Sequence, residues 1–218
     1  MSEINYKIIL IGNSGVGKTS LFRKLSTGEF NEKNISTIGI EKKSLEVDVN
    51  IGAGGSNKTK FSISLYDTAG QEKFRAITRN YFKESDGIFL LYDITNKISF
   101  DNVEQWIDSI RNSIGDTRDA KYAIVLMGNK LDLVDEGIKE REVTEEDAKN
   151  VCKKYDMIWG GEQSTKDINM DKLTELFEEY VREIYKRIGV KKVGKQTSKK
   201  LAEKKKKTTN ICFKFLSS

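Results

Sequence analysis

The stretch Gly12-Asn13-Ser14-Gly15-Val16-Gly17-Lys18-Thr19 decides the fold, because it fits the pattern G-x-x-x-x-G-K-[ST] directly after the apolar run Tyr6–Ile11. Glycines let the backbone curl so that several N–H groups point inward, and a following helix adds the positive end of its dipole. Leu21, Phe22 and Leu25 indicate such a helix. The order strand, glycine loop and helix predicts a loop that binds the phosphates of a nucleoside triphosphate.

Three side chains at the end of this loop have predicted roles. Lys18 would bridge the β- and γ-phosphates, and the Thr19 hydroxyl would bind Mg²⁺, with Ser20 beside it in the nucleotide site. A chance glycine-rich turn with a surface lysine is the alternative. The motif alone does not distinguish guanine from adenine nucleotides.

Short apolar runs alternate with amphipathic segments along the chain, which is typical of an α/β protein with a mostly parallel sheet. We predict buried strands at Tyr6–Ile11, Ile88–Tyr92 and Tyr122–Met127. Met157–Trp159 is a weaker strand candidate, because Gly160-Gly161 follows and should soften that edge.

One region alternates with period two instead. Apolar residues recur at every second position over 45–51 and again over 61–65, and Gly52–Asn57 lies between them, which predicts a β-hairpin with a long tip. Apolar residues at helical spacing predict helices that cover 103–114, 148–155 and 170–188.

Composition excludes several kinds of chemistry. The chain has no His, so a Ser-His-Asp triad and a His-ligated zinc site are excluded. Its two Cys, Cys152 and Cys212, cannot form a disulfide framework, so we expect a reducing compartment. We expect Cys152, on the apolar face of a helix, to lie in the core.

The formal net charge of +5 is unevenly distributed. Residues 189–218 carry ten Lys and one Glu, so residues 1–188 have a net charge of −4. Because a nucleic-acid-binding fold would carry its basic excess on the folded body, we expect no nucleic acid partner. We predict one domain over 1–188 and a flexible, disordered Lys-rich tail over 189–218.

A second motif, Gly128-Asn129-Lys130-Leu131-Asp132, follows the strand predicted at Tyr122–Met127. Loops at the carboxyl ends of parallel strands share one crevice, so this loop can meet the first. Asp132 can accept the N1–H and 2-amino donors of guanine, whereas adenine offers no such pair. Asn129 can bridge the base to neighbouring loops, and the Lys130 stem can lie along its face, although N-K-x-D alone is a common polar turn.

A third motif, Tyr66-Asp67-Thr68-Ala69-Gly70-Gln71-Glu72, follows the second hairpin strand. Asp67 suits coordination of Mg²⁺ directly or through water, and Gly70 allows a backbone N–H to approach the γ-phosphate. Gln71 can hold a water in line for attack on that phosphate. The motif alone could be an ordinary turn, but the three together are rarely accidental.

With these motifs the sequence resembles the Ras-like small GTPases, and within them the Rab group most closely, over about residues 5–188. The Rab resemblance rests on further stretches, which are Thr37-Ile38-Gly39-Ile40, residues 71–78 (QEKFRAIT), residues 91–96 (LYDITN), and Ser99-Phe100 followed by Val103 and Trp106.

The resemblance implies a P-loop GTPase fold with a six-stranded, mostly parallel sheet flanked by helices. It implies that Thr37 closes on Mg²⁺ with Thr19 and Asp67 when the γ-phosphate is present. It also assigns Ser164, Thr165 and Lys166 to the last guanine-contacting loop, whose family form is E-T-S-A-K. Thr165 replaces the alanine, but since that contact is made by a backbone N–H we expect it to survive with a modest loss.

Two departures from the Rab pattern concern partners and anchoring. Lys42 and Tyr66 stand where Rabs usually have an aromatic residue and Trp, which together with an aromatic near Tyr81 form the surface that effectors contact. Rabs end in prenylated cysteines, whereas Cys212 is followed by six residues and is neither C-a-a-X nor a terminal pair. Cys212 is either unmodified or palmitoylated.

The tail offers another route to a membrane. Lys204–Lys207 precede Ile211, Phe213, Phe215 and Leu216, so we expect residues 191–216 to bind an anionic membrane surface, with a solvated tail as the alternative. No run is long enough to span a bilayer, and the first residues do not form a secretory signal. We expect a cytoplasmic protein, peripheral on membranes through this tail.

The sequence therefore predicts a monomeric, Rab-like GTP/GDP switch that binds Mg²⁺ and slowly hydrolyses GTP, with Gln71 and Lys18 as catalytic residues, acting in membrane or vesicle traffic. Matching loops offer no arginine finger, so a GTPase-activating protein, an exchange factor and effectors are expected partners. The alternatives are a non-catalytic Rab mimic, acting as scaffold or decoy, and a P-loop ATPase, against which Asp132 argues.

Overall fold

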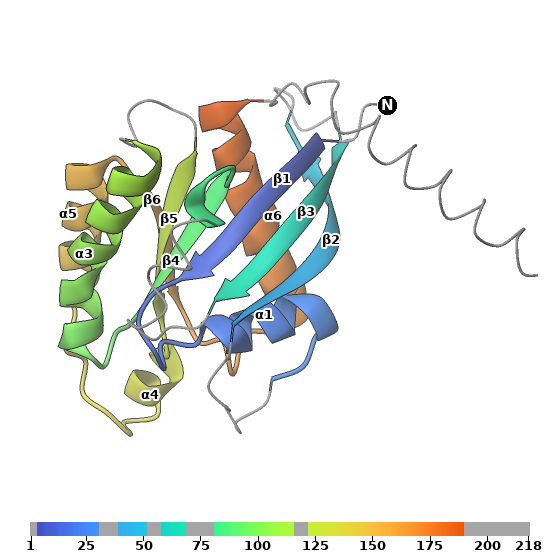
Figure 1. The fold of residues 1–218 in the computed structure, drawn as a ribbon. Coiled ribbons are helices and arrows are strands. Elements are labelled where there is room, and N and C mark those ends of the chain that lie inside the picture. The colour runs from blue at the N-terminus through green and yellow to red at the C-terminus, as the bar shows by residue number, and fades with distance from the viewer. Residues whose placement is uncertain (1–3, 31–38, 52–57, 69–80, 116–121, 190–218) are drawn as a thin grey trace, which may run out of the picture.

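The computed structural model of the chain describes residues 4–30, 39–51, 58–68, 81–115 and 122–189 (Figure 1). Along the chain the elements are β1 (Ile4–Ile11), α1 (Lys18–Thr27), β2 (Ile40–Asn50), β3 (Lys58–Thr68), β4 (Gly87–Asp93), α3 (Lys97–Ile114), β5 (Ala123–Asn129), α4 (Leu131–Asp135), α5 (Glu145–Tyr155), β6 (Ile158–Gln163) and α6 (Met170–Ile188).

The strands form one six-stranded sheet in the order β2-β3-β1-β4-β5-β6. Every neighbouring pair is parallel except β2 and β3, which are antiparallel. The predicted fold class is thus confirmed, including the hairpin strands, which extend further than the alternation indicated. The predicted hairpin tip, Gly52–Asn57, lies outside the described residues.

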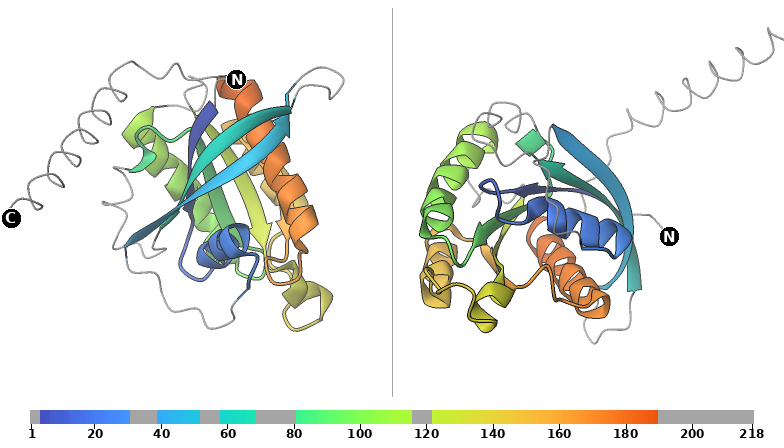
Figure 2. Two further views of the ribbon diagram at one scale, coloured as in Figure 1. Left: turned by 90° about the vertical axis from the view of Figure 1, so that its right-hand side faces the viewer. Right: turned by 90° about the horizontal axis from the view of Figure 1, so that it is seen from below.

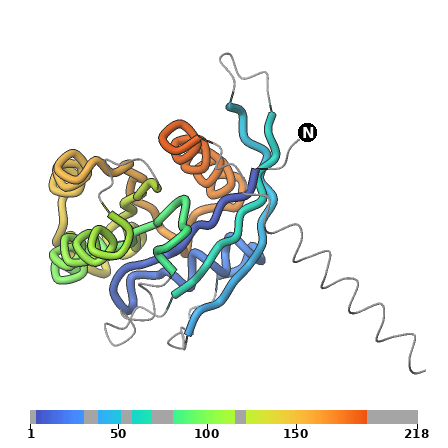
Figure 3. The backbone as a smooth tube through the Cα atoms, turned by 45° about the horizontal axis from the view of Figure 1, so that its top comes forward, coloured from blue at the N-terminus to red at the C-terminus, as the bar shows by residue number. Residues whose placement is uncertain are grey.

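Helices cover both faces of the sheet, α1 and α6 on one side and α3 and α5 on the other (Figure 2). β1 serves both layers, because successive side chains of a strand point to opposite faces. Ile8 and Leu10 pack with the α6 residues Phe177 and Val181, while Ile9 and Ile11 join the cluster that contains α3. Figure 3 shows β2 and β3 as the strand pair farthest from α3 and α5.

Polar side chains fix where the long helices begin. Asn96, Thr144 and Asn169 each accept a hydrogen bond from the backbone N–H three residues on, at the starts of α3, α5 and α6. Cys152 of α5 is buried as expected, and burial raises the pKa of its thiol to about 12. None of the described helices is long and apolar enough to cross a membrane.

The last described helix ends just before the Lys-rich tail, and the domain division predicted at residue 188 stays a prediction. α6 ends at Ile188, and Gly189 follows it with a φ of 63°, a conformation that glycine adopts readily. The Lys-rich tail from residue 190 lies outside the described residues, so its disorder stays a prediction.

The Gly160-Gly161 pair, expected to soften the sheet edge, lies inside β6. Gly160 is buried, and its carbonyl accepts a hydrogen bond from the Tyr180 hydroxyl of α6. A Cβ at Gly160 would lie 2.8 Å from Val125 Cγ1 and 2.9 Å from Met127 Cγ. Glycine fits here because side chains of the adjacent strand β5 occupy the space where a Cβ would lie.

Gly160→Ala should therefore lower the free energy of unfolding by about 1–3 kcal/mol, because a methyl group would overpack the core. Urea denaturation of the purified protein measures this change. The control is the double variant Gly160→Ala with Val125→Ala, because the second change removes the Cγ1 atom that lies 2.8 Å from the added Cβ. Additive losses of stability in the double variant would contradict the packing argument.

Candidate functional site

The glycine loop lies between β1 and α1 at the carboxyl edge of the sheet, and backbone conformation explains its glycines. Gly12, Gly15 and Gly17 have φ values of 135°, 79° and 100°, which favour glycine. A Cβ would lie 2.2 Å from Leu91 O at Gly12 and 2.1 Å from Asn129 Nδ2 at Gly17. The loop is thus pressed against the ends of β4 and β5, and only glycine fits at these two positions.

Lys18 begins α1 and folds back over this loop. Its side chain is 4% exposed and its Nζ donates to Asn13 O at 2.7 Å. Burial lowers the pKa of its ammonium to about 8, and the nearby Asp67 acts against this shift. An anionic ligand beside the amine would favour its charged form, as the phosphate-binding hypothesis requires.

Asn13 also connects the loop to the opposite helix layer. Its Oδ1 accepts a hydrogen bond of 3.0 Å from Trp106 Nε1 of α3. Trp106 is almost fully buried, so the indole fixes the loop relative to the core.

Two of the three predicted metal ligands lie together. Thr19 Oγ1 donates to Asp67 Oδ2 at 2.7 Å, and Asp67 is fully buried near the end of β3. A hydroxyl and a carboxylate are the hard oxygen donors that Mg²⁺ prefers, and Mg²⁺ is usually held by few protein ligands together with substrate phosphates. Among the described residues no group of three or more His, Cys, Asp or Glu could hold a metal. The pair therefore fits Mg²⁺ that is shared with a phosphate ligand.

On the other side of the site, Asn129 joins three segments. Its Nδ2 donates to Val16 O at 2.8 Å, while its Oδ1 accepts from Thr165 N at 3.0 Å and from Thr165 Oγ1 at 2.8 Å. The Thr165 N–H, which the resemblance assigns to the base, thus donates to Asn129 here. Asn129 thus joins the phosphate loop to the loop 164–166, and its predicted contact with the base stays a prediction.

The next residues of this motif are also held in place. Lys130 has a φ of 71°, and its ammonium pairs with the buried Asp93 at 2.8 Å. Asp132 is 8% exposed and lies in the first turn of the short helix α4. Lys166 pairs with Glu136 at 3.5 Å, and the charges of Glu136 and Asp132 raise the pKa of its amine.

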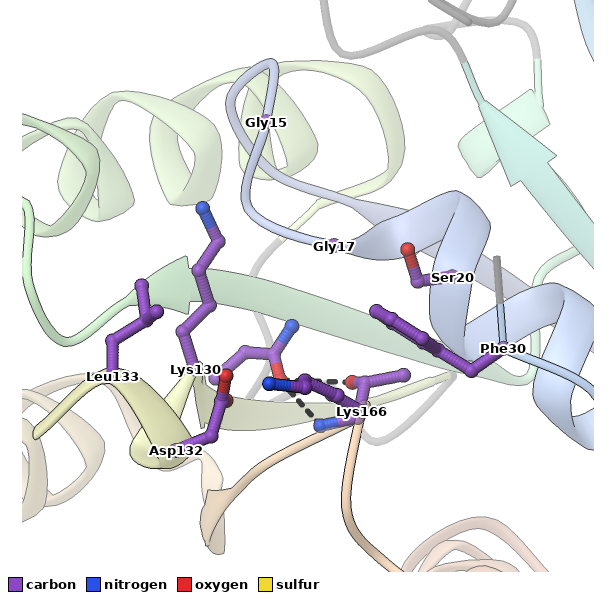
Figure 4. A pocket seen from close by; sticks show the side chains of 10 residues that line it. Gly15, Gly17, Ser20, Phe30, Lys130, Asp132, Leu133 and Lys166 are labelled. Carbon is purple, nitrogen blue, oxygen red and sulfur yellow. Dashed lines mark hydrogen bonds between the residues drawn. The ribbon is translucent and has the colours of Figure 1, made fainter. Parts of the chain in front are cut away.

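A cavity of about 130 Å³ opens between these segments (Figure 4). It is lined by Gly15, Gly17, Ser20, Phe30, Asn129, Lys130, Asp132, Leu133, Thr165 and Lys166. The predicted phosphate and base loops therefore meet at one site. Ser164 lies in the same loop as Thr165, where its Oγ accepts from Asp167 N at 3.0 Å.

Three residues at this site lie outside the predicted set, and one of them is Leu133 of α4, which lines the cavity. Phe30, in the segment after α1, turns its ring toward the cavity in Figure 4. Lys24 of α1 is 6% exposed and donates to the Thr165 and Lys166 carbonyls. Neither Phe30 nor Lys24 belongs to a recognisable pattern. The spacing of four residues between Ser20 and Lys24, which places them on the same helix face, is the nearest signal for Lys24.

Three predicted residues, Thr37, Gly70 and Gln71, lie outside the described residues. Their roles at the γ-phosphate and metal stay predictions.

With this geometry in place, comparison with known proteins decides the family. The family model of the Ras family matches residues 7–186. The chain belongs to the Ras family. The match covers nearly all of the predicted domain and both halves of the cavity, so the family resemblance is confirmed.

The similar curated proteins are Rab members of this family. The chain is 33% identical to Ras-related protein Rab-13 of Mesocricetus auratus over 95% of each chain, and 37% identical to Ras-related protein Rab11B of Nicotiana tabacum over 83% of this chain and 75% of that protein. It is 35% identical to Ras-related protein Rab-26 of Bos taurus over 78% of this chain. The matched part covers only 60% of the length of that relative.

The close approach at Gly17 gives a test of this Ras-family site. Gly17→Ala should weaken GDP binding at least about tenfold, because the methyl group would displace the Asn129 amide. Gly15→Ala is the control, since its backbone also has positive φ but nothing lies within 4 Å of its Cβ. Isothermal titration with GDP measures both, and similar losses would show that Gly17 acts through the backbone alone.

Proposed function

We propose that the protein is a GTP/GDP-cycling switch that binds guanine nucleotide with Mg²⁺ and slowly hydrolyses GTP. The observation that carries this proposal is that one cavity is lined by Gly17 of the phosphate loop together with Asn129 and Asp132. Lys18 follows Gly17 directly, and Thr19 donates to Asp67 at the same edge of the sheet. Ras-family membership supports the same reading. Titration with GDP and ADP tests it, and preference for ADP would contradict it.

Selection of guanine is assigned to Asp132. A carboxylate only accepts hydrogen bonds, and guanine presents two adjacent donors, the N1–H and the 2-amino group. Because Asp132 is nearly buried, a base without these donors would leave its charge poorly compensated. Phe30 and the Lys130 stem offer apolar surface for the faces of the base.

Hydrolysis is assigned to positioning and electrostatics. Lys18 balances charge that develops on the phosphates, and Gln71 orients the attacking water. Thr19, Asp67 and Thr37 would hold Mg²⁺, which supplies further positive charge at the phosphates when bound. Turnover is expected to be slow without a GTPase-activating protein, because the matching loops contain no arginine finger.

The two nucleotide states are proposed to differ through Thr37 and Gly70, which would engage the γ-phosphate and be released on hydrolysis. An exchange factor and effectors would then read the state during membrane or vesicle traffic. We propose that the protein is monomeric, acts in the cytoplasm and reaches anionic membranes through residues 191–216.

One observation favours the second candidate, a guanine-nucleotide-binding scaffold or decoy. Lys42 Nζ lies 5.6 Å from the centre of the Tyr66 ring, and Lys7 Nζ lies 5.3 Å from Tyr66 and 5.4 Å from Tyr81. Lysines thus surround the tyrosines at the surface where related proteins present apolar groups. Single-turnover hydrolysis of GTP separates the two candidates.

Asp132→Asn tests base selection. The amide turns an acceptor pair into one acceptor and one donor, so GDP affinity should fall on the order of 100-fold while affinity for xanthosine diphosphate rises. Competition titrations measure both constants. Asp135→Asn, at an exposed position of the same helix, is the control. Unchanged GDP affinity in Asp132→Asn would remove this residue from base recognition.

Gln71→Leu tests hydrolysis. Leucine cannot hold a water, so single-turnover GTP hydrolysis should slow by at least about tenfold, and the variant should accumulate GTP. Bound nucleotide after loading is measured by chromatography. Hydrolysis at the wild-type rate would show that Gln71 does not have the assigned role, and no hydrolysis by the wild-type protein would favour the scaffold.

A further inference from the structure

Two hydrogen-bonding groups near the cavity have no role in the proposed chemistry. They are the ammonium of Lys24, in the second turn of α1, and the hydroxyl of Thr165. Both hold the loop 164–166 in place, since Asn129 accepts from the N–H and hydroxyl of Thr165 while Lys24 donates to the Thr165 carbonyl.

The Lys24 contacts are specific. Its Nζ donates to Thr165 O at 2.9 Å and to Lys166 O at 2.8 Å, two successive carbonyls of a loop that lines the cavity. Burial lowers the pKa of its amine, against the influence of Asp167. An apolar side chain would fill this position without the cost of burying a charge. Lys24 therefore acts through the N–H donors of its ammonium, which hold the carbonyl groups of Thr165 and Lys166 in one orientation.

The Thr165 hydroxyl and the Thr165 N–H together fix the orientation of the Asn129 amide. Oδ1 of Asn129 accepts from both Thr165 donors, so Nδ2 must face Val16 O. The amide nitrogen carries two hydrogens, and the plane fixed by Thr165 also directs the second one. In the family form E-T-S-A-K this position is alanine, which has no hydroxyl, so this contact comes from the chain's own residue.

Together these bonds close a ring. It runs from Val16 through Asn129 and Thr165 to Lys24, which returns to the phosphate loop along α1. Ser20 lies one helical turn before Lys24 and lines the cavity, so the ring lies directly beside the space for a base. Breaking one bond would loosen the base side of the cavity.

We propose that Lys24 and the Thr165 hydroxyl are positioning residues, which hold Asn129 and the Thr165–Lys166 backbone so that a bound guanine nucleotide dissociates slowly. This inference rests on the proposed function, because it concerns the same site. It adds Lys24 to the site and gives the side chain of Thr165 a role of its own, and both act through Asn129 and the loop backbone.

The test is the dissociation of a fluorescent GDP from the full-length protein, chased with unlabelled GDP. Thr165→Val keeps the shape and removes the hydroxyl, so dissociation should accelerate about three- to tenfold. Thr165→Ser keeps the hydroxyl and should restore slow dissociation. In Thr165→Val the association rate should change less than the dissociation rate, because substitutions at a binding site mostly change how long the ligand stays bound.

Lys24→Met should accelerate dissociation about ten- to 100-fold, since two buried carbonyls lose their donor. Lys24→Arg keeps donors and should restore part of the loss. Lys153→Met, at an exposed position of α5, and Thr174→Ala, at an exposed position of α6, are the matched controls. Thermal unfolding of each variant is measured alongside.

Wild-type dissociation rates in Thr165→Val and Lys24→Met would overturn the proposal. Lower thermal stability without faster dissociation would also overturn it, because the residues would then serve folding alone. If Lys24→Met does not fold, the Thr165 pair decides. Failure of the wild-type protein to bind GDP would instead overturn the proposed function, and this inference with it.

Discussion

The side-chain amide of Asn129 is the contact on which the site depends. It bonds to Val16 in the phosphate loop and to Thr165 in the last loop, and so joins segments that are 113 and 36 residues away along the chain. The arrangement requires Gly17 to have no side chain, because any Cβ there would occupy the position of the amide nitrogen. The contact of Asn129 with the phosphate loop therefore depends on glycine at position 17.

The sheet makes this contact rigid. All seven residues of β4 and all seven of β5 are buried, so the strands on which these loops are mounted are covered on both faces. Parallel strands place their carboxyl ends at one edge, which brings the loops that follow β1 and β5 close to the last residues of β3. Packing of α3 and α6 against opposite faces thus positions side chains that no local sequence preference could bring together.

The sequence allowed the fold and most of this site to be predicted, because periodicity and motifs are local signals. Asn129, Lys18, Thr19 and Asp67 belong to motifs at strand ends, and topology alone brings them together. Lys24 could not be predicted, since its partners are backbone carbonyls 141 and 142 residues away and its burial arises only when the loop 164–166 packs on α1. The closeness of Gly160 to Val125 and Met127 arises in the same way, from tertiary packing that periodicity does not encode.

The surface beside the site combines the rings of Tyr66 and Tyr81 with the positive charges of Lys7 and Lys42. Tyr66 and Asp67 are consecutive in β3, so their side chains point to opposite faces of the sheet. The surface formed by Tyr66 and Tyr81 and the Thr19–Asp67 pair therefore lie on the two sides of one strand. Lys42 pairs with Tyr66 across β2 and β3. A cation over an exposed ring contributes about 0.5–1 kcal/mol, whereas burying a large apolar side chain contributes about 1.5–3 kcal/mol. Lys7 and Lys42 beside these rings therefore give the surface positive charge and contacts that contribute less than a buried apolar side chain would.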